Sequence, residues 1–84
     1  MTNKEIFGSA YRRFLREAVT ARPADYAYSI DLVDEVANRM LAGFERGSAN
    51  KDSTACRKTC KHLGISHTYK AINAFLKGGN DAQD

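Results

Sequence analysis

The amino-acid sequence predicts an all-α protein: a compact four-helix domain over residues 1–84 that ends in a helix-turn-helix-like hairpin. Apolar side chains recur at intervals of three or four residues in successive segments, which is typical of amphipathic helices. No segment shows the alternating pattern of a half-buried strand. With 84 residues, 43% of them apolar and 27% charged, the chain has the size and composition of one globular domain.

The first helix is expected at residues 3–21. Thr2 followed by Glu5 has the spacing of a capping box, in which each side chain bonds the backbone amide of the other residue. Pro23 ends the helix, because its ring clashes with the preceding turn and disfavours helical geometry at Arg22. The apolar stripe of this helix consists of Phe7, Tyr11, Phe14, Leu15 and Ala18.

The second helix is expected at residues 29–46, with Ser29 or Asp31 as its N-cap. Its apolar stripe repeats the spacing of the first and predicts an antiparallel helix pair. Leu32 and Val36 widen this stripe, which indicates either a central position in the bundle, the simpler interpretation, or a contact in a homodimer. The stripe consists of Val33, Ala37, Met40, Leu41 and Phe44.

The third helix is expected at residues 53–63, after a polar loop at residues 47–52 that begins with a helix-ending glycine. Asp52 or Ser53 can cap its start. Gly64 can take the left-handed conformation that closes a helix.

The fourth helix is expected at residues 67–77, with Ser66 as its N-cap. Just before it, Ile65 can fold back against Cys60, as expected of a glycine-closed helix end. Its apolar face consists of Tyr69, Ile72, Phe75 and Leu76.

The step from the third to the fourth helix has the spacing of a helix-turn-helix, whose second helix can enter the major groove of DNA. When Gly64 is aligned with the glycine of that motif, the positions normally buried six and nine residues later are Lys70 and Asn73. The second helix is therefore rotated, or the turn is one residue tighter, relative to the usual motif. A generic helical hairpin with one basic face is the competing interpretation.

The positive charge lies in the second half of the chain. Residues 1–47 carry seven basic and seven acidic side chains, whereas residues 51–77 carry six basic side chains and only Asp52 against them. This asymmetry favours an anionic partner over a merely solvated surface. The candidate binding residues, which can contact phosphates, bases or a partner protein, are Arg57, Lys58, Lys61, His62, His67, Lys70, Asn73 and Lys77.

Two cysteines and two histidines raise the hypothesis of a zinc site: Cys56, Cys60, His62 and His67. The thiols share one helical face, but His62 lies about 200° further around the axis and His67 follows the turn, so the four ligands are not expected to converge. Two reduced, buried thiols at a helix contact are the simpler interpretation. We therefore expect no metal and no cofactor, and the absence of a catalytic motif predicts that the protein is not an enzyme.

The stretch ACRKTCKHLGISHTYKAINAFL resembles segments of small, uncharacterised phage and prophage proteins with the pattern C-K-x-L-G-I-x-H-T-x-K-A-I-x-A-[FY]-L. The resemblance covers residues 55–76 and implies a mobile-element context, with action on nucleic acid or on host complexes that handle it. We expect a cytoplasmic, non-enzymatic regulatory or accessory protein that engages nucleic acid and not a membrane. The alternative is an inhibitor that binds a host protein complex, such as an anti-CRISPR or transcription inhibitor.

Overall fold

The computed structural model of the protein describes residues 1–78, and it confirms the all-α prediction: these residues form helices and turns and no strand. The predicted boundaries are close to those observed, with the largest differences at the starts of the second and fourth helices. The elements in chain order are α1 (Asn3–Ala21), the short 3-10 helices η1 (Pro23–Asp25) and η2 (Ile30–Leu32), α2 (Val33–Arg46), α3 (Thr54–Leu63) and α4 (Tyr69–Leu76).

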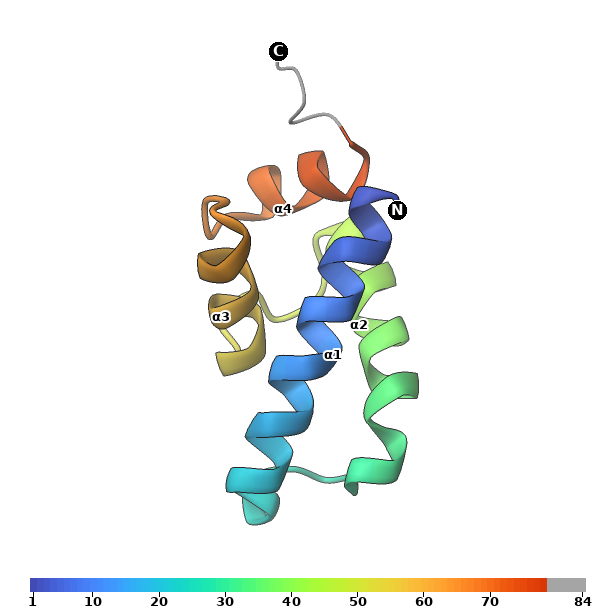
Figure 1. Ribbon diagram of the computed structural model, residues 1–84, viewed down its shortest axis with the longest axis vertical. Coiled ribbons are helices and arrows are strands. Elements are labelled where there is room, and N and C mark those ends of the chain that lie inside the picture. Colours follow the sequence, from blue (N-terminus) through green and yellow to red (C-terminus); the bar gives the residue numbers. More distant parts are fainter. Residues whose placement is uncertain (79–84) are drawn as a thin grey trace.

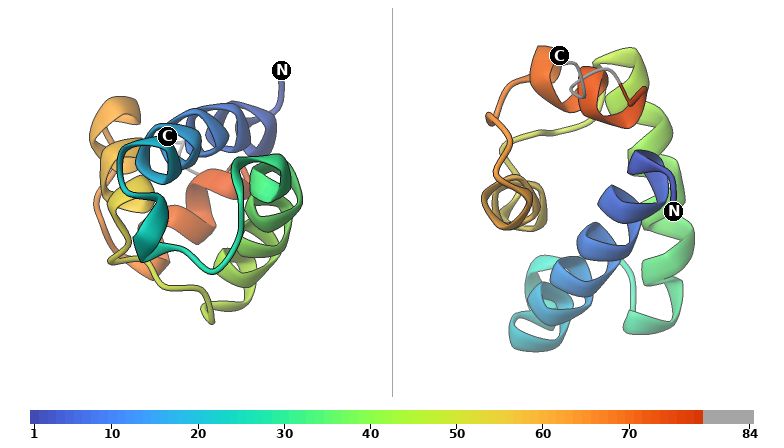
Figure 2. Two further views of the ribbon diagram at one scale, coloured as in Figure 1. Left: turned by 90° about the horizontal axis from the view of Figure 1, so that it is seen from below. Right: turned by 45° about the horizontal axis from the view of Figure 1, so that its top comes forward.

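Helix α1 is the centre of the arrangement, since it packs against α2, α3 and α4. It runs antiparallel to α2, as predicted, and α4 lies across the end where α1 begins and α2 ends (Figure 1). Figure 2 shows that α2 and α3 lie on opposite sides of α1. Helix α4 also packs against α2, which closes this end of the core. None of the helices within residues 1–78 is long and apolar enough to cross a lipid bilayer.

The buried apolar side chains of α1 recur at four-residue intervals: Phe7, Tyr11, Leu15 and Val19. The rings of Phe7 and Tyr11 each meet Phe44 of α2 edge-on, with centroids 5.9 Å and 5.7 Å apart. Phe14 of the predicted stripe is partly buried and packs against the core, whereas Val19, which was not in the predicted stripe, is buried more fully than Ala18.

Several local signals for the helix ends are confirmed. Thr2 and Glu5 form the capping box of α1, and the Ser53 hydroxyl accepts a hydrogen bond from the Cys56 amide at the start of α3. Gly64 closes α3 with a φ of 71°, and the Ile65 amide donates to the carbonyl of Cys60 at 3.0 Å.

Two predicted N-caps are wrong. Helix α2 begins at Val33 with Leu32 at its N-cap position, so neither Ser29 nor Asp31 caps it, and Ser29 makes no side-chain cap bond to η2 either. Helix α4 begins two residues later than expected, and its cap is Thr68, whose hydroxyl accepts from the Ala71 amide at 3.1 Å, in place of Ser66. The connection between α3 and α4 is therefore longer than the predicted spacing.

The expected central position of Leu32 is also wrong, since 44% of its surface is exposed, together with 38% for Ile30. Both lie in η2, whose tighter winding places side chains out of register with the stripe of the following α-helix. Val36, inside α2, packs partly buried against the core. A homodimer contact through Leu32 stays a prediction.

Candidate nucleic-acid interface

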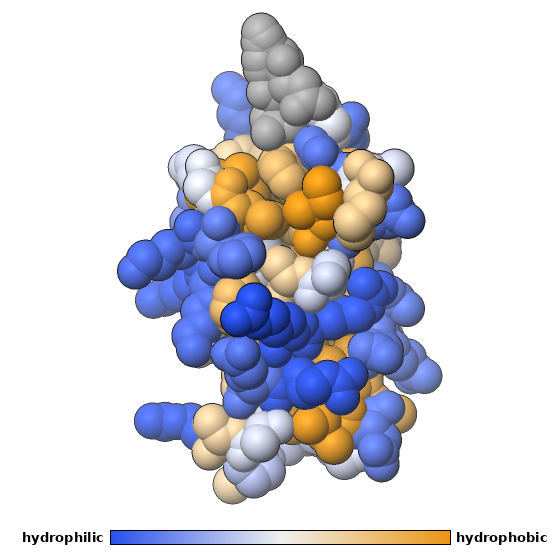
Figure 3. Space-filling model, viewed as in Figure 1, coloured by the Kyte–Doolittle hydropathy of each residue, from blue (hydrophilic) through white to orange (hydrophobic). Residues whose placement is uncertain are grey.

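Helix α3 has one buried and one basic face. Its buried residues, which contact the core, are Ala55, Cys56, Thr59 and Cys60. The opposite residues are all exposed, and we call them the basic face of α3: Arg57, Lys58, Lys61 and His62. Because residues four apart lie one above the other on a helix, Arg57 and Lys61 form one row and Lys58 and His62 a second. Figure 3 shows hydrophilic side chains projecting on the side of the molecule where α3 lies.

Acidic side chains of α2 are engaged by cations of α1. Glu45 pairs with Lys4 at 3.3 Å, and Asp34 pairs with Arg16 at 3.4 Å. Asp52, just before α3, accepts a hydrogen bond from Lys51 at 3.1 Å. This bond and the charge of Lys51 are the main causes that lower the pKa of Asp52, and the charges of His67 and Arg57 lower it further.

The cations of α3 and α4 have no such partners. Within residues 1–78, no ion pair joins a carboxylate to Arg57, Lys58, Lys61, Lys70 or Lys77. Lys70 and Lys77 are exposed and lie seven residues apart, and therefore on one side of α4 and its end. The charge asymmetry in the sequence thus corresponds to exposed, unpaired cations in the described structure.

His62 connects the basic face of α3 to α1. Its ring meets the Phe14 ring edge-on, with centroids 5.7 Å apart. The guanidinium of Arg13 lies 5.3 Å from the centre of the same Phe14 ring, a distance typical of a cation–π contact. Sequence reasoning missed this cluster, because Phe14 was assigned to the core and Arg13 to the charge-balanced half of the chain.

Two predicted binding residues point into the fold. The Asn73 side-chain amide donates to the carbonyl of Glu45 at 2.7 Å, and the His67 ring nitrogen Nε2 bonds the carbonyl of Lys51. Between them, the Tyr69 hydroxyl donates to the carbonyl of Ala49. These three side chains fasten α4 to the end of α2 and to the following loop. The stripe shared by Tyr69, Asn73 and Leu76 was a signal that Asn73 lies at the edge of the buried face.

The cysteines occupy the predicted packing positions. Cys56 and Cys60 are 0% and 1% exposed, on the core side of α3. The hydrogen bond with Cys60 and burial raise the pKa of Cys56, so its thiol stays protonated at neutral pH. His62 and His67 lie against Phe14 and Lys51 and not against the thiols. Among the residues that the structure describes, no three His, Cys, Asp or Glu side chains are grouped to hold a metal ion.

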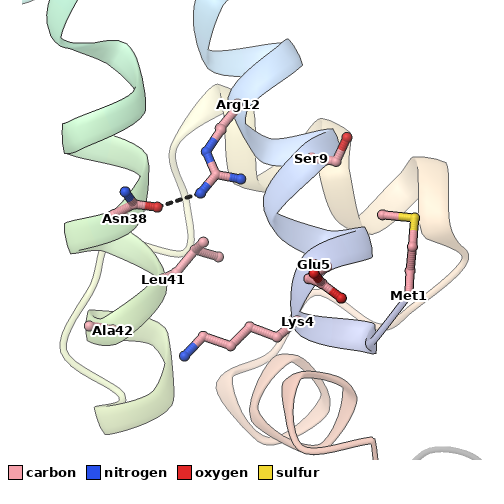
Figure 4. Close-up of a pocket in the computed structure, with 8 residues that line it drawn as sticks. All are labelled: Met1, Lys4, Glu5, Ser9, Arg12, Asn38, Leu41 and Ala42. Atoms are coloured by element: carbon pink, nitrogen blue, oxygen red, sulfur yellow. Dashed lines mark hydrogen bonds between the residues drawn. The ribbon is translucent and has the colours of Figure 1, made fainter.

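A surface groove of about 640 Å³ lies between α1 and α2 (Figure 4). Its polar side chains already bond across it: Arg12 donates to the amide oxygen of Asn38, and Lys4 reaches Glu45. Gly8 lies in the same contact, where a Cβ would come within 3.1 Å of Leu41. This groove is therefore the surface of a helix contact whose polar groups satisfy one another.

Comparisons with models of protein families, with curated proteins and with solved structures found no match to this chain.

Proposed function

We propose that this protein is a small, non-enzymatic accessory or regulatory protein that binds nucleic acid through the basic face of α3, with Lys70 and Lys77 as additional contacts. The observation that carries the proposal is the set of exposed cations without carboxylate partners. A cation that is already paired within a protein gains little binding free energy from a phosphate. An unpaired cation that neutralises a phosphate releases the counterions condensed on the nucleic acid, which favours binding. The basic face of α3 is thus the surface best suited to a polyanion.

The spacing of the cations supports this proposal. Arg57 and Lys61 are separated by one helical turn, or about 6 Å along the axis. A nucleic-acid strand carries one phosphate per ~3.4 Å of helix rise, so both side chains of a row can reach phosphates of the same strand. Contacts of this kind position a protein without reading sequence. The Asn73 side chain points into the fold, so the amide best suited to read adenine is not available to a ligand. This favours binding without sequence preference.

The resemblance of residues 55–76 to phage and prophage proteins supports a mobile-element context and a cytoplasmic site of action. These parts of the proposal rest on sequence alone. A mobile-element protein of this size acts by occupying a nucleic acid or a partner, since a small helical domain offers binding surface but little enclosed volume.

The test is a salt titration of binding to a labelled oligonucleotide. We expect Lys58→Ala and Lys61→Ala each to lower the slope of log affinity against log salt by about one unit. Arg39→Ala is the matched control, because Arg39 is paired with Glu35 at 3.3 Å and lies on α2. Its slope should equal that of the wild type.

Absence of binding to single-stranded and duplex nucleic acid at low salt would overturn the proposal. A pull-down with nuclease present then tests the alternative of a protein-binding inhibitor. If a protein is retained by the wild type but not by Lys58→Ala or Lys61→Ala, the basic face of α3 binds that protein instead.

A further inference from the structure

A second groove lies between α1 and α3, beside the basic face. It has a volume of about 290 Å³, and its apolar walls include Ile6 and Ala10 of α1 and Leu63 of α3. Arg13 and His62 line it from opposite helices. We call this the α1–α3 groove. Figure 3 shows that apolar side chains gather on this face of the molecule, near the end where α1 begins and α4 crosses.

The α1–α3 groove contains no carboxylate, unlike the groove at the other end of the same helix pair. The groove at that other end is lined by the carboxylates of Glu17 and Asp25 together with the cations of Arg22 and Lys58. A polyanion that follows the basic face of α3 therefore meets acidic groups at the start of the helix and none at its end. Charge complementarity favours occupation of the α1–α3 groove.

The side chains on the rim are suited to planar rings. His62 is exposed and held edge-on by Phe14, which limits its rotamers before a ligand arrives. The Arg13 guanidinium is planar, and its ion pair with Glu17 is long, at 3.6 Å, and exposed, so this ion pair contributes little that a ligand would have to replace. Imidazole and guanidinium planes are the surfaces on which proteins stack unpaired bases.

From these observations we infer that the α1–α3 groove receives an unstacked nucleobase, so that the ligand class is single-stranded nucleic acid; this inference rests on the proposed function. The base inserts between the apolar walls and stacks against His62 and Arg13. Lys58, one turn before His62 in the same row, and Lys61 contact the flanking phosphates. A duplex can offer a base to this groove only after the base is unpaired and unstacked, which costs free energy that a single strand does not require.

The experiment compares oligonucleotides of about 15 nucleotides by fluorescence anisotropy: a single strand, a duplex, and a single strand of abasic sites. We expect the wild type to bind the normal single strand at least about 10-fold more tightly than the abasic one. His62→Ala should lose roughly 5-fold to 100-fold for the normal strand and little for the duplex or the abasic strand. His62→Phe, which keeps a ring, should retain the preference for bases.

Lys61→Ala removes a charge but no ring, and it should therefore lower the affinity for all three probes to the same extent. Circular dichroism melts of each variant verify that the exposed substitutions leave the fold intact. Equal affinity for normal and abasic strands, or unchanged single-strand binding by His62→Ala when Lys61→Ala weakens it, would overturn this inference and leave the proposed function standing. Absence of binding to all three probes would overturn both.

Discussion

The side-chain amide of Asn73 donates a 2.7 Å hydrogen bond to the backbone carbonyl of Glu45, 28 residues earlier in the chain. This bond fixes α4 against the C-terminal end of α2. It also gives a structural role to the side chain that sequence reasoning had considered as a reader of adenine.

Replacement of Asn73 by alanine should lower the free energy of unfolding by about 1–2 kcal/mol, because a partly buried carbonyl loses its donor. Any sequence preference in nucleic-acid binding should not change. Lys70→Ala, an exposed change on the same helix, is the control: it should weaken binding and leave stability within about 0.5 kcal/mol. A fully stable Asn73→Ala protein with an altered base preference would contradict the assigned role. Denaturant unfolding and binding titrations measure both effects.

The start of α4 can be tested with two neighbouring hydroxyl residues. Thr68→Ala should cost about 1 kcal/mol, because the Ala71 amide loses its capping oxygen. Ser66→Ala removes an exposed hydroxyl outside the helix and should change the free energy of unfolding by less than about 0.5 kcal/mol. Urea unfolding of the two variants gives the comparison. The reverse order of effects would show that the helix begins where the sequence pattern first suggested.

Gly43 permits a close approach of the loop to α2. A Cβ at this position would lie 2.9 Å from the Cβ of Ala49, and the Ser48 amide bonds the Gly43 carbonyl at 2.8 Å. We expect Gly43→Ala to destabilise the protein by about 1–2 kcal/mol, since overpacking costs more than the gain in helix propensity. Removing the opposing methyl group should relieve the clash. The double variant Gly43→Ala/Ala49→Gly should therefore be more stable than the sum of the single changes predicts, and simple additivity in thermal melts would refute the close contact.

The loss of stability at alkaline pH should depend on the ionisation of Tyr11. Burial raises the pKa of Tyr11 to about 12, and the nearby Ser53 side chain opposes the shift only in part. Because the folded-state pKa lies above the value of 10 in the unfolded chain, the stabilising effect is complete below pH 10 and is lost as the pH rises toward 12. The loss should reach about 2–3 kcal/mol.

The matched variants for this pH dependence are Tyr11→Phe and Tyr28→Phe. Tyr11→Phe should remove the part of the loss between pH 10 and 12 that comes from Tyr11 and leave the part that comes from Cys56, whose pKa is also raised. Tyr28→Phe should remove less, because burial raises the pKa of this more exposed residue without a large shift. Denaturant unfolding at a series of pH values measures the three curves. A Tyr11→Phe curve parallel to that of the wild type would exclude Tyr11 as the source.

Features determined by neighbouring residues were predictable from the sequence. The capping box at Thr2, the Ser53 cap and the closure at Gly64 depend on residues within one turn, and each was found as expected. The start of α4 was not predictable in this way. Ser66 and Thr68 are both good N-caps, and the choice between them depends on distant partners, since His67 and Tyr69 bond carbonyls of the loop before α3.

The candidate interface likewise combines features that the sequence predicts with features that depend on distant contacts. The excess of basic residues in the second half follows from the sequence, and the exposed face that carries Arg57, Lys58 and Lys61 follows from helical spacing. The meeting of His62 with Phe14 could not be predicted, because it joins residues 48 positions apart through the packing of α3 on α1. Tertiary contacts of this kind leave no periodic signal in either segment.

The three hydrogen bonds from His67, Tyr69 and Asn73 to carbonyls of α2 and its loop have a consequence for folding cooperativity. In the folded state the path of the loop is held by bonds to the α4 segment, and the α4 segment depends in turn on carbonyls of α2 and the loop. Helix α3, which lies between them in the chain, is therefore anchored through both of its ends. In native-state hydrogen exchange, α3 and α4 should unfold together as one unit and their amides should therefore exchange with the same opening free energy. A substitution that destabilises α4 should then lower the protection of the amides along the whole basic face.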